Sequence, residues 1–136
     1  MLFDRIHHLT FVVRDLENSI PHLQDGLGIE SLIREDLPGR GVRTARFRAG
    51  DTWIVLVQPI ADGEPQRFLL ARGEGLFLIS YEVPSLDAAL AQLSSRGGTC
   101  LGAPRAGLAG WRMADIQSAA MPGVVTQLCE DPATAR

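Results

Sequence analysis

The hydrophobic positions of this chain fall into two similar series. In the first, residues 5–13 (RIHHLTFVV) form a short apolar stretch, and Asp15 then starts a segment whose apolar residues recur every three or four positions. In the second, residues 76–83 (LFLISYEV) precede Ser85 and a similar segment. A shift of 70 residues matches the strands, the helix caps, the apolar helix faces and the terminating glycines. One shift that matches all four features indicates an internal duplication.

Each copy is expected to fold as a strand, a helix and three further strands. After its first strand and helix, the first copy offers strands at 29–34, 42–47 and 52–57, with turns at 36–41 and 49–51. The second copy offers a strand at 76–83, a helix at 85–95, strands at 100–101, 111–116 and 124–129, and a loop at 102–110. This βαβββ repeat predicts an α+β fold, and the tail at 131–136 is expected to fray.

The chain is expected to be a single domain, residues 1–136, built from two modules. The first module spans 5–60 and the second 76–130, and a linker at 61–75 joins them. A connection of this length usually has structure of its own. The apolar run at 68–70 is therefore expected to form a short helix.

Composition excludes several classes of function. The 136 residues, 46% of them hydrophobic, suffice for one core, and the net charge of −3 gives no basic surface for nucleic acid. No apolar run approaches the ~20 residues of a membrane span, and the N-terminus lacks the features of a signal peptide. Cys100 and Cys129 have no metal-ligand spacing, so two free thiols are expected. These features favour a cytoplasmic protein without nucleic-acid or membrane partners.

Several segments resemble a known family. The openings IHHLTFVVRDLENSI and LISYEVPSLDAAL and the closing GVVTQLCE resemble the vicinal oxygen chelate superfamily of glyoxalase-like proteins. Within it, REDLPGRGVRTARF, TWIVLVQPI and FLLARGEGL are most similar to methylmalonyl-CoA epimerase. The resemblance implies that each copy curls into an incomplete barrel around a cavity, which usually holds a divalent metal. It also implies a homodimer, because members commonly dimerise or swap modules.

The resemblance implies four metal positions, on the first and last strands of each copy. The first is His8. The second is Val55, where relatives carry Gln or Glu. The third is Leu78, where relatives carry His, and the fourth is Gln127, where relatives carry Glu. A hard cation needs several oxygen or imidazole donors at once, and valine and leucine donate nothing. We therefore expect no tightly bound metal and no cofactor in this site.

The same substitutions affect the epimerase reaction that the resemblance implies. That reaction removes the proton next to a thioester carbonyl, which requires a carboxylate base. In relatives one base is the metal-binding Glu, here Gln127, and the opposing base falls where this sequence has Thr44. Neither side chain accepts a proton at neutral pH, so authentic methylmalonyl-CoA epimerase activity is not expected.

Alternate strand positions are expected to line the cavity, with the four metal positions taken as inward. The resulting set mixes aromatic, aliphatic and polar groups, which suits a small organic ligand. The expected ligand-binding residues are His8, Thr10, Thr44, Arg46, Trp53, Val55, Leu78, Ser80, Glu82, Trp111, Met113 and Gln127.

The charged members of this set allow two interpretations. The duplication places Arg46 and Asp115 in equivalent positions, so the two could form an ion pair; alternatively, Arg46 binds a carboxylate or phosphate of the ligand. Glu82 is expected to be a rim residue or the partner of an arginine.

His8 also allows two interpretations. It is either a hydrogen-bonded structural histidine or a metal-free general acid or base, oriented by Glu82 or Gln127. Its neighbour His7 is expected to point toward the helix and to take no part in chemistry. His22 is expected on the exposed side of the first helix.

Three functions are consistent with these residues. The first is a metal-free protein that binds a small, apolar or aromatic molecule, which the loss of two ligands and the presence of Trp53 and Trp111 favour. The second is a metal-independent lyase or isomerase of a biosynthetic pathway, with His8 as its catalytic residue and Glu82 or Asp115 as partner. The third is a metal-dependent epimerase or lactoylglutathione lyase-like enzyme that uses a different ligand set.

Overall fold

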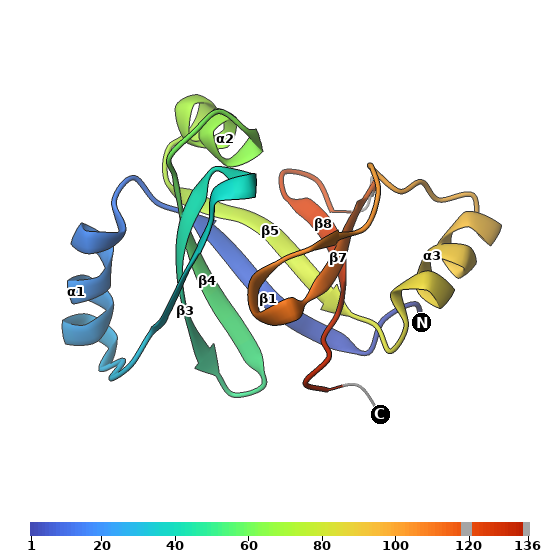
Figure 1. Cartoon of the computed structure of the whole chain (residues 1–136), viewed down its shortest axis with the longest axis horizontal. Helices are drawn as coiled ribbons and strands as arrows, with labels where there is room; N and C mark the ends of the chain where they lie inside the picture. Colours follow the sequence, from blue (N-terminus) through green and yellow to red (C-terminus); the bar gives the residue numbers. More distant parts are fainter. Residues whose placement is uncertain (118–120, 135–136) are drawn as a thin grey trace. The chain divides into compact units, whose positions relative to one another are not determined.

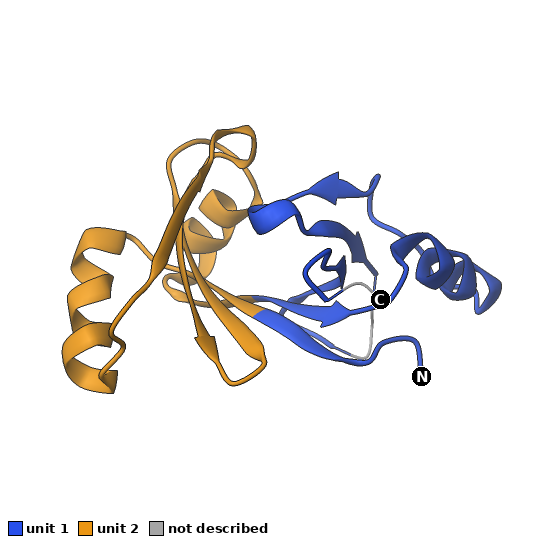
Figure 2. Cartoon of the chain, turned by 60° about the horizontal axis from the view of Figure 1, so that its bottom comes forward, with its two compact units in different colours: residues 1–8, 78–136 blue, residues 9–77 orange. Residues whose placement is uncertain are grey.

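The computed structural model describes residues 1–117 and 121–134. The chain forms two compact units, shown in Figure 2: unit 1 contains residues 1–8 and 78–136, and unit 2 contains residues 9–77. Strands β1 (Arg5–Val12) and β5 (Gly75–Glu82) each contribute residues to both units. None of the helices in the described residues has the length and apolar composition to span a bilayer.

The first helix of unit 2 is α1 (Leu16–Leu27), at the position expected from the sequence. Its N-terminus is capped by Asp15, whose side chain accepts the Glu17 N–H, and its C-terminus ends at Gly28 in the left-handed conformation with φ of 69°. Leu16 and Ile20 are buried, whereas Leu27 is 71% exposed. The apolar stripe of the helix therefore ends before its last turn.

The rest of unit 2 is an antiparallel sheet and a short helix. Strands β2 (Ile33–Leu37), β3 (Val42–Ala49) and β4 (Thr52–Pro59) pair in sequence order, with a 3-10 turn (Pro38–Arg40) between the first two. The strand expected at 29–34 starts later, because its pairing with β3 begins at Ile33. Helix α2 (Glu64–Arg72) forms in the linker, where a short helix was expected. The core contains Val13, Leu16, Ile20, Ala45 and Leu56.

Unit 1 repeats this plan. Helix α3 (Leu86–Ser95) is capped by Ser85, whose hydroxyl accepts the Ala88 N–H. Strand β5 pairs in parallel with β8 (Val125–Glu130), and β7 (Arg112–Ile116) lies antiparallel between β8 and the short β6 (Arg105–Ala106). The strand expected at 100–101 is a single bridge, and the loop expected at 102–110 contains β6 and a 3-10 turn (Leu108–Gly110). The core contains Tyr81, Val83, Leu86, Ala89 and Leu128.

The duplication extends to single hydrogen bonds. The Leu16 N–H at the start of α1 donates to the side chain of Gln58 on β4. In the second copy, the Leu86 N–H at the start of α3 donates to the side chain of Glu130 at the end of β8. These two bonds satisfy helix N-terminal donors that have no partner within the helix. The predicted α+β fold of two βαβββ modules is therefore confirmed (Figure 1).

Candidate functional site

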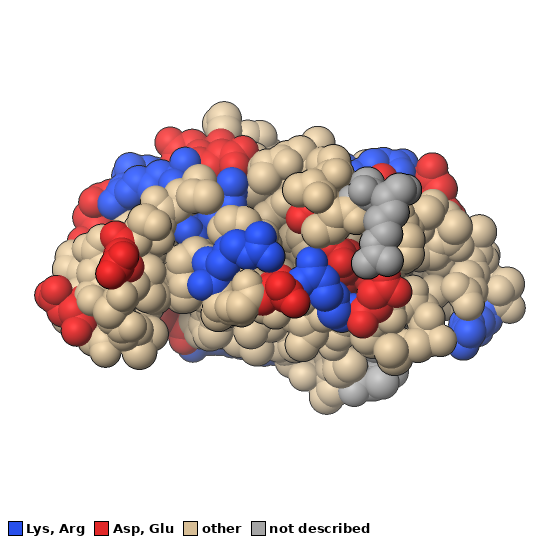
Figure 3. Space-filling model, turned by 90° about the horizontal axis from the view of Figure 1, so that it is seen from below, with Lys and Arg blue, Asp and Glu red and all other residues tan. Residues whose placement is uncertain are grey.

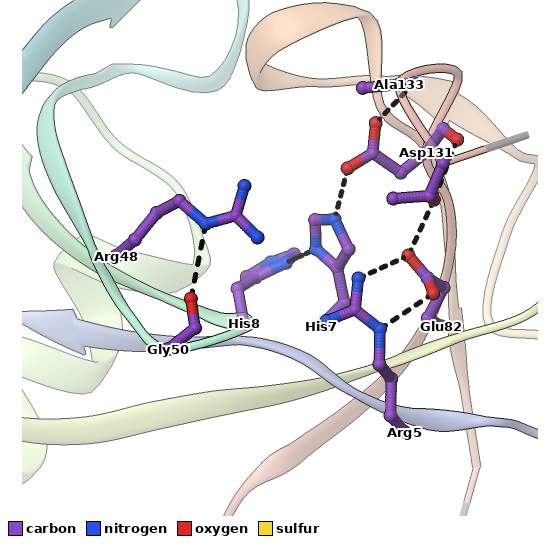
Figure 4. Close-up of polar contacts among 9 residues, drawn as sticks. Arg5, His7, His8, Arg48, Gly50, Glu82, Asp131 and Ala133 are labelled. Atoms are coloured by element: carbon purple, nitrogen blue, oxygen red, sulfur yellow. Dashed lines mark hydrogen bonds and ion pairs between the residues drawn. The ribbon is translucent and has the colours of Figure 1, made fainter.

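A buried chain of hydrogen bonds connects the C-terminal segment of unit 1 to strand β1 (Figure 4). His7 Nε2 lies 2.7 Å from Oδ2 of Asp131, and His7 Nδ1 lies 2.8 Å from Nδ1 of His8. The other carboxylate oxygen of Asp131 accepts the Ala133 N–H at 2.9 Å, which fixes the carboxylate. His7 is fully buried, whereas His8 keeps 4% of its surface exposed. The chain therefore ends at the more accessible of the two rings.

The protons of this chain follow from its donors and acceptors. A carboxylate only accepts, so His7 donates its Nε2 proton to Asp131. The donor and acceptor at the 2.8 Å contact between the two Nδ1 atoms depend on the tautomers of the rings. When His7 is neutral, its Nδ1 has a lone pair, so His8 donates from its own Nδ1 and its Nε2 carries no proton. Burial, with smaller contributions from the charges of His7 and Arg105, holds the pKa of His8 well below its usual range. His8 is therefore a neutral imidazole at neutral pH.

Trp111 fixes both histidine rings. Its ring lies on that of His8, with centroids 4.8 Å apart and an angle of 23° between the planes. It meets the His7 ring edge-on, with centroids 4.5 Å apart. Trp111 is only 2% exposed, so this tryptophan, expected to line a ligand cavity, instead packs against the two histidines.

A second polar chain runs across β6, β7 and β8. The Arg105 guanidinium donates to Oδ1 of Asp115 at 3.2 Å, and Gln127 Nε2 donates to the same oxygen at 3.0 Å. Because the amide nitrogen of Gln127 is committed to Asp115, its carbonyl oxygen is directed elsewhere. Within residues 1–117 and 121–134 this buried oxygen has no hydrogen-bond partner. It is an acceptor in a fixed orientation.

Glu82 does not orient His8. It accepts two hydrogen bonds from the Arg5 guanidinium, at 2.9 and 3.2 Å, and one from the Thr134 hydroxyl at 2.8 Å (Figure 4). Burial raises the pKa of Glu82, but the bonds from Arg5 and Thr134 outweigh it and lower that pKa. Glu82 is thus the partner of an arginine, one of the two expected roles.

The expected site residues of unit 2 form a separate group. The Thr44 hydroxyl donates to the Glu35 carbonyl, and Arg46 pairs with the Glu35 carboxylate at 2.8 Å. The guanidinium carbons of Arg46 and Arg48 lie 5.4 and 5.1 Å from the centre of the Trp53 ring. Each of the two residues considered for an ion pair, Arg46 and Asp115, has a partner within its own unit.

The remaining expected site residues are also buried. Exposure is at most 8% for Thr10, Val55, Leu78, Ser80 and Met113. Ser80 lies opposite Gln127 in the register of β5 and β8, and Leu78 lies opposite Val125. In unit 1, His8, Leu78, Ser80 and Gln127 are thus all buried.

Sequence reasoning missed three residues of this site. His7 was expected to face the helix, but its ring bonds to His8 and Asp131. Asp131 was expected in a frayed tail, although the Asp-Pro pair at 131–132 is a turn signal and the carboxylate does close an Asx-type turn on Ala133. Arg105 was placed in an irregular loop, but it lies on β6. His22 is exposed, as expected.

Comparison with known proteins adds to this geometry. Residues 7–114 match the family model described as the glyoxalase/bleomycin resistance protein/dioxygenase superfamily. The chain belongs to this superfamily. It is 30% identical over 103 residues to an ethylmalonyl-CoA/methylmalonyl-CoA epimerase from Cereibacter sphaeroides, a match that covers 74% of this chain and 77% of the relative.

Solved structures of two epimerases are similar over almost the whole chain. The methylmalonyl-CoA epimerase of Mycobacterium tuberculosis has 28% identity and a TM-score of 0.88, with 96% of this chain and 89% of that chain covered. A variant of the Streptomyces coelicolor enzyme in complex with 2-nitronate-propionyl-CoA has 25% identity, a TM-score of 0.88 and coverage of 98% and 99%. These similarities confirm the glyoxalase-like fold.

The metal site of the superfamily does not fit the residues of this chain. Val55 and Leu78 are buried hydrocarbon side chains that offer no donor atom. Gln127 donates its amide nitrogen to Asp115 and could offer only a neutral oxygen. His8 alone among the four positions carries a strong ligand, and one imidazole does not hold a hard divalent cation.

Within residues 1–117 and 121–134, two other buried groups bring potential ligand atoms within 4.8 Å of one another. In the first (His7, Glu82, Asp131), the Arg5 ion pair and the His7–Asp131 bond already satisfy the side chains. In the second (His7, His8, Cys129), burial, followed by the charges of Asp131 and Glu82, raises the pKa of the Cys129 thiol, which keeps it protonated. We assign neither group as a resident metal site.

Proposed function

We propose that this protein binds a small organic molecule, an acyl thioester, in unit 1 without the metal of its superfamily. The Gln127 carbonyl oxygen carries this proposal, because it is a fixed, buried acceptor without a partner in the described residues. Leaving such an atom unpaired costs about 1–3 kcal/mol, and a hydrogen-bond donor on a ligand would recover that energy.

Two further groups support binding of an oxygen-rich ligand. The guanidinium of Arg105 is positioned by Asp115, and its side chain retains 23% exposure. The neutral ring of His8 has an Nε2 atom that no protein group engages among the described residues. The guanidinium donates to an acyl oxygen or a carboxylate. The Gln127 oxygen and the unprotonated Nε2 are acceptors, which suit N–H or O–H donors elsewhere on the ligand, such as the amide N–H groups of the CoA arm.

The class of ligand is suggested by the relatives. The relatives compared above are epimerases of methylmalonyl-CoA or of ethylmalonyl-CoA and methylmalonyl-CoA, and one of the structures is a complex with 2-nitronate-propionyl-CoA. This chain lacks three of the four metal donors that the family resemblance implies, so binding here should depend on Arg105 and Gln127 instead. On the face shown in Figure 3, basic and acidic side chains are interspersed.

The test is calorimetric titration of protein in EDTA with 2-nitronate-propionyl-CoA and with methylmalonyl-CoA, using free CoA as the control ligand. We expect both acyl thioesters to bind more tightly than CoA and to raise the melting temperature. Arg105→Gln should weaken binding about tenfold or more. The matched control Arg112→Gln, in an exposed pair with Asp87, should leave it unchanged.

Two results would contradict the proposal. Binding that appears only after manganese or cobalt is added would show that a metal is required. Absence of acyl-thioester binding with or without metal would show that the ligand class is wrong. A panel of aromatic compounds in the same assay then tests the ligand class that the two tryptophans suggest.

A further inference from the structure

We infer that Asp131, His7 and His8 form a proton relay that makes Nε2 of His8 a metal-free general base. This inference rests on the proposed function, because it assigns chemistry to the site in which the acyl thioester binds. The activity is proton transfer at the carbon next to the thioester carbonyl. The superfamily chemistry expected from sequence would have used carboxylates at Gln127 and Thr44, which this chain lacks.

The geometry provides an unbroken path for the proton. The two hydrogen bonds that join Asp131 to His7 and His7 to His8 measure 2.7 and 2.8 Å, both within ordinary hydrogen-bond range. Trp111 packs against both rings and restricts their rotation. The path ends at His8, which is 4% exposed and is the more accessible residue of the pair.

The proton transfer balances without any other reactant. The bond from carbon to hydrogen breaks, its electron pair stays on the substrate as an enolate, and the proton joins Nε2 of His8. The Nδ1 proton of His8 moves to Nδ1 of His7, while the His7 Nε2 proton stays on its bond to Asp131. Reversal of these steps returns a proton to the carbon on the same face or, after the enolate reorients, on the other.

The relay moves the positive charge from His8 toward a carboxylate. A proton retained on His8 would leave a second positive charge near Arg105, in a buried position. Transfer to His7 places the charge beside the carboxylate of Asp131, 2.7 Å away. Asp131 and His7 are thus positioning residues, and His8 is the residue that touches the substrate.

The arrangement also distinguishes this role from a structural one. A histidine buried only for packing would need one partner for each nitrogen, whereas His8 is bonded on Nδ1 and has no partner on Nε2 among the described residues. This orientation directs Nε2, the basic nitrogen of His8, away from His7, which holds the ring through Nδ1. In catalytic sites, a base is commonly oriented by a third group that hydrogen-bonds to it, and His7 takes that position relative to His8 here.

The test measures deuterium incorporation at C2 of methylmalonyl-CoA in D₂O, with EDTA present, by mass spectrometry. We expect exchange with the unaltered protein and a loss of at least about 100-fold with His8→Gln. His7→Gln and Asp131→Asn should lower kcat about tenfold or more with little change in KM. Asp87→Asn, on the exposed surface of α3, is the matched control and should retain full exchange.

A second readout is independent of turnover. Long-range proton–nitrogen correlation spectra of ¹⁵N-histidine-labelled protein identify which nitrogen of each ring is protonated. We expect His8 protonated on Nδ1 and bare at Nε2, and we expect this tautomer to be lost in His7→Phe. A His8 ring protonated at Nε2 in the resting protein would overturn the relay.

The remaining outcomes separate the two proposals. Binding of 2-nitronate-propionyl-CoA in EDTA without any exchange would overturn the relay and leave the proposed function intact. Absence of both binding and exchange would overturn both. Exchange that survives in His7→Gln, or that requires added metal, would overturn the relay while acyl-thioester binding still stands on its own measurement.

Discussion

Arg46 and Asp115 occupy equivalent positions in the two copies of the repeat and carry opposite charges. Arg46 on β3 pairs with Glu35 on β2 at 2.8 Å, and Asp115 on β7 pairs with Arg105 on β6 at 3.2 Å. In both copies the partners are diagonal neighbours: Glu35 lies opposite Thr44, two positions before Arg46, and Arg105 lies opposite Met113, two positions before Asp115. The duplication has therefore preserved a cross-strand ion pair while reversing its polarity.

This reversal leads to a prediction about stability. Arg105→Asp should destabilise unit 1 by about 2–4 kcal/mol, because it places a second carboxylate beside the buried Asp115. The double variant Arg105→Asp with Asp115→Arg should recover most of the loss, since it recreates the polarity of the first copy and Gln127 can rotate its amide to accept from arginine. Urea denaturation of both single variants and the double variant measures the interaction free energy between residues 105 and 115. Additive losses would show that the pair makes no net contribution.

The elements were predictable because their signals are local. Asp15 and Ser85 cap helices that start at the next residue, and Gly28 ends the first one. The ion pairs were not predictable, because copy equivalence suggested that Arg46 and Asp115 face each other. The actual partners, Glu35 and Arg105, are 70 residues apart, and Arg46 and Asp115 are 69 residues apart. The reversal of charge between the two pairs becomes apparent only when the strand register is known.

The site was harder to predict than the fold for a related reason. Strand alternation assigns His7 and His8 to opposite faces, yet it does not fix how each ring turns about its side-chain bonds. The contact that orients His7 comes from Asp131, which is 124 residues away along the chain. No local pattern contains that information, so the sequence identified His8 but not its support.

The low proton affinity of His8 should make stability depend on pH. Burial holds the pKa of His8 below its ordinary value of 6.5, so below that pH the unfolded chain binds a proton that the folded chain does not. Stability should therefore rise with pH through this range and fall as the solution is acidified. Between about pH 7.5 and about pH 5.5, His8→Gln should lose less stability than the unaltered protein. Parallel curves for the two proteins would contradict this expectation.

The two cysteines should differ in reactivity. Cys129 is fully buried, and burial raises the pKa of its thiol, so little thiolate forms at mildly alkaline pH. Cys100 is partly exposed. Labelling with iodoacetamide followed by peptide mass spectrometry should modify Cys100 in the folded protein and Cys129 only after denaturation. Cys129→Ser, which cannot be alkylated, confirms the assignment, and rapid labelling of Cys129 in the folded state would show that its strand opens readily.

The metal content of the protein tests whether the four superfamily positions bind a metal ion. Protein purified without chelator, and again after incubation with manganese, cobalt, nickel and zinc, should contain well below one metal ion per chain, because Val55 and Leu78 offer no donor atom. The variant Leu78→His with Gln127→Glu restores an imidazole and a carboxylate beside His8 in unit 1, so it should bind manganese or cobalt measurably more tightly. A stoichiometric metal in the unaltered protein would instead point to the buried group of His7, Glu82 and Asp131. Glu82→Gln would then release the ion, and the relay would have to be abandoned in favour of metal-dependent chemistry.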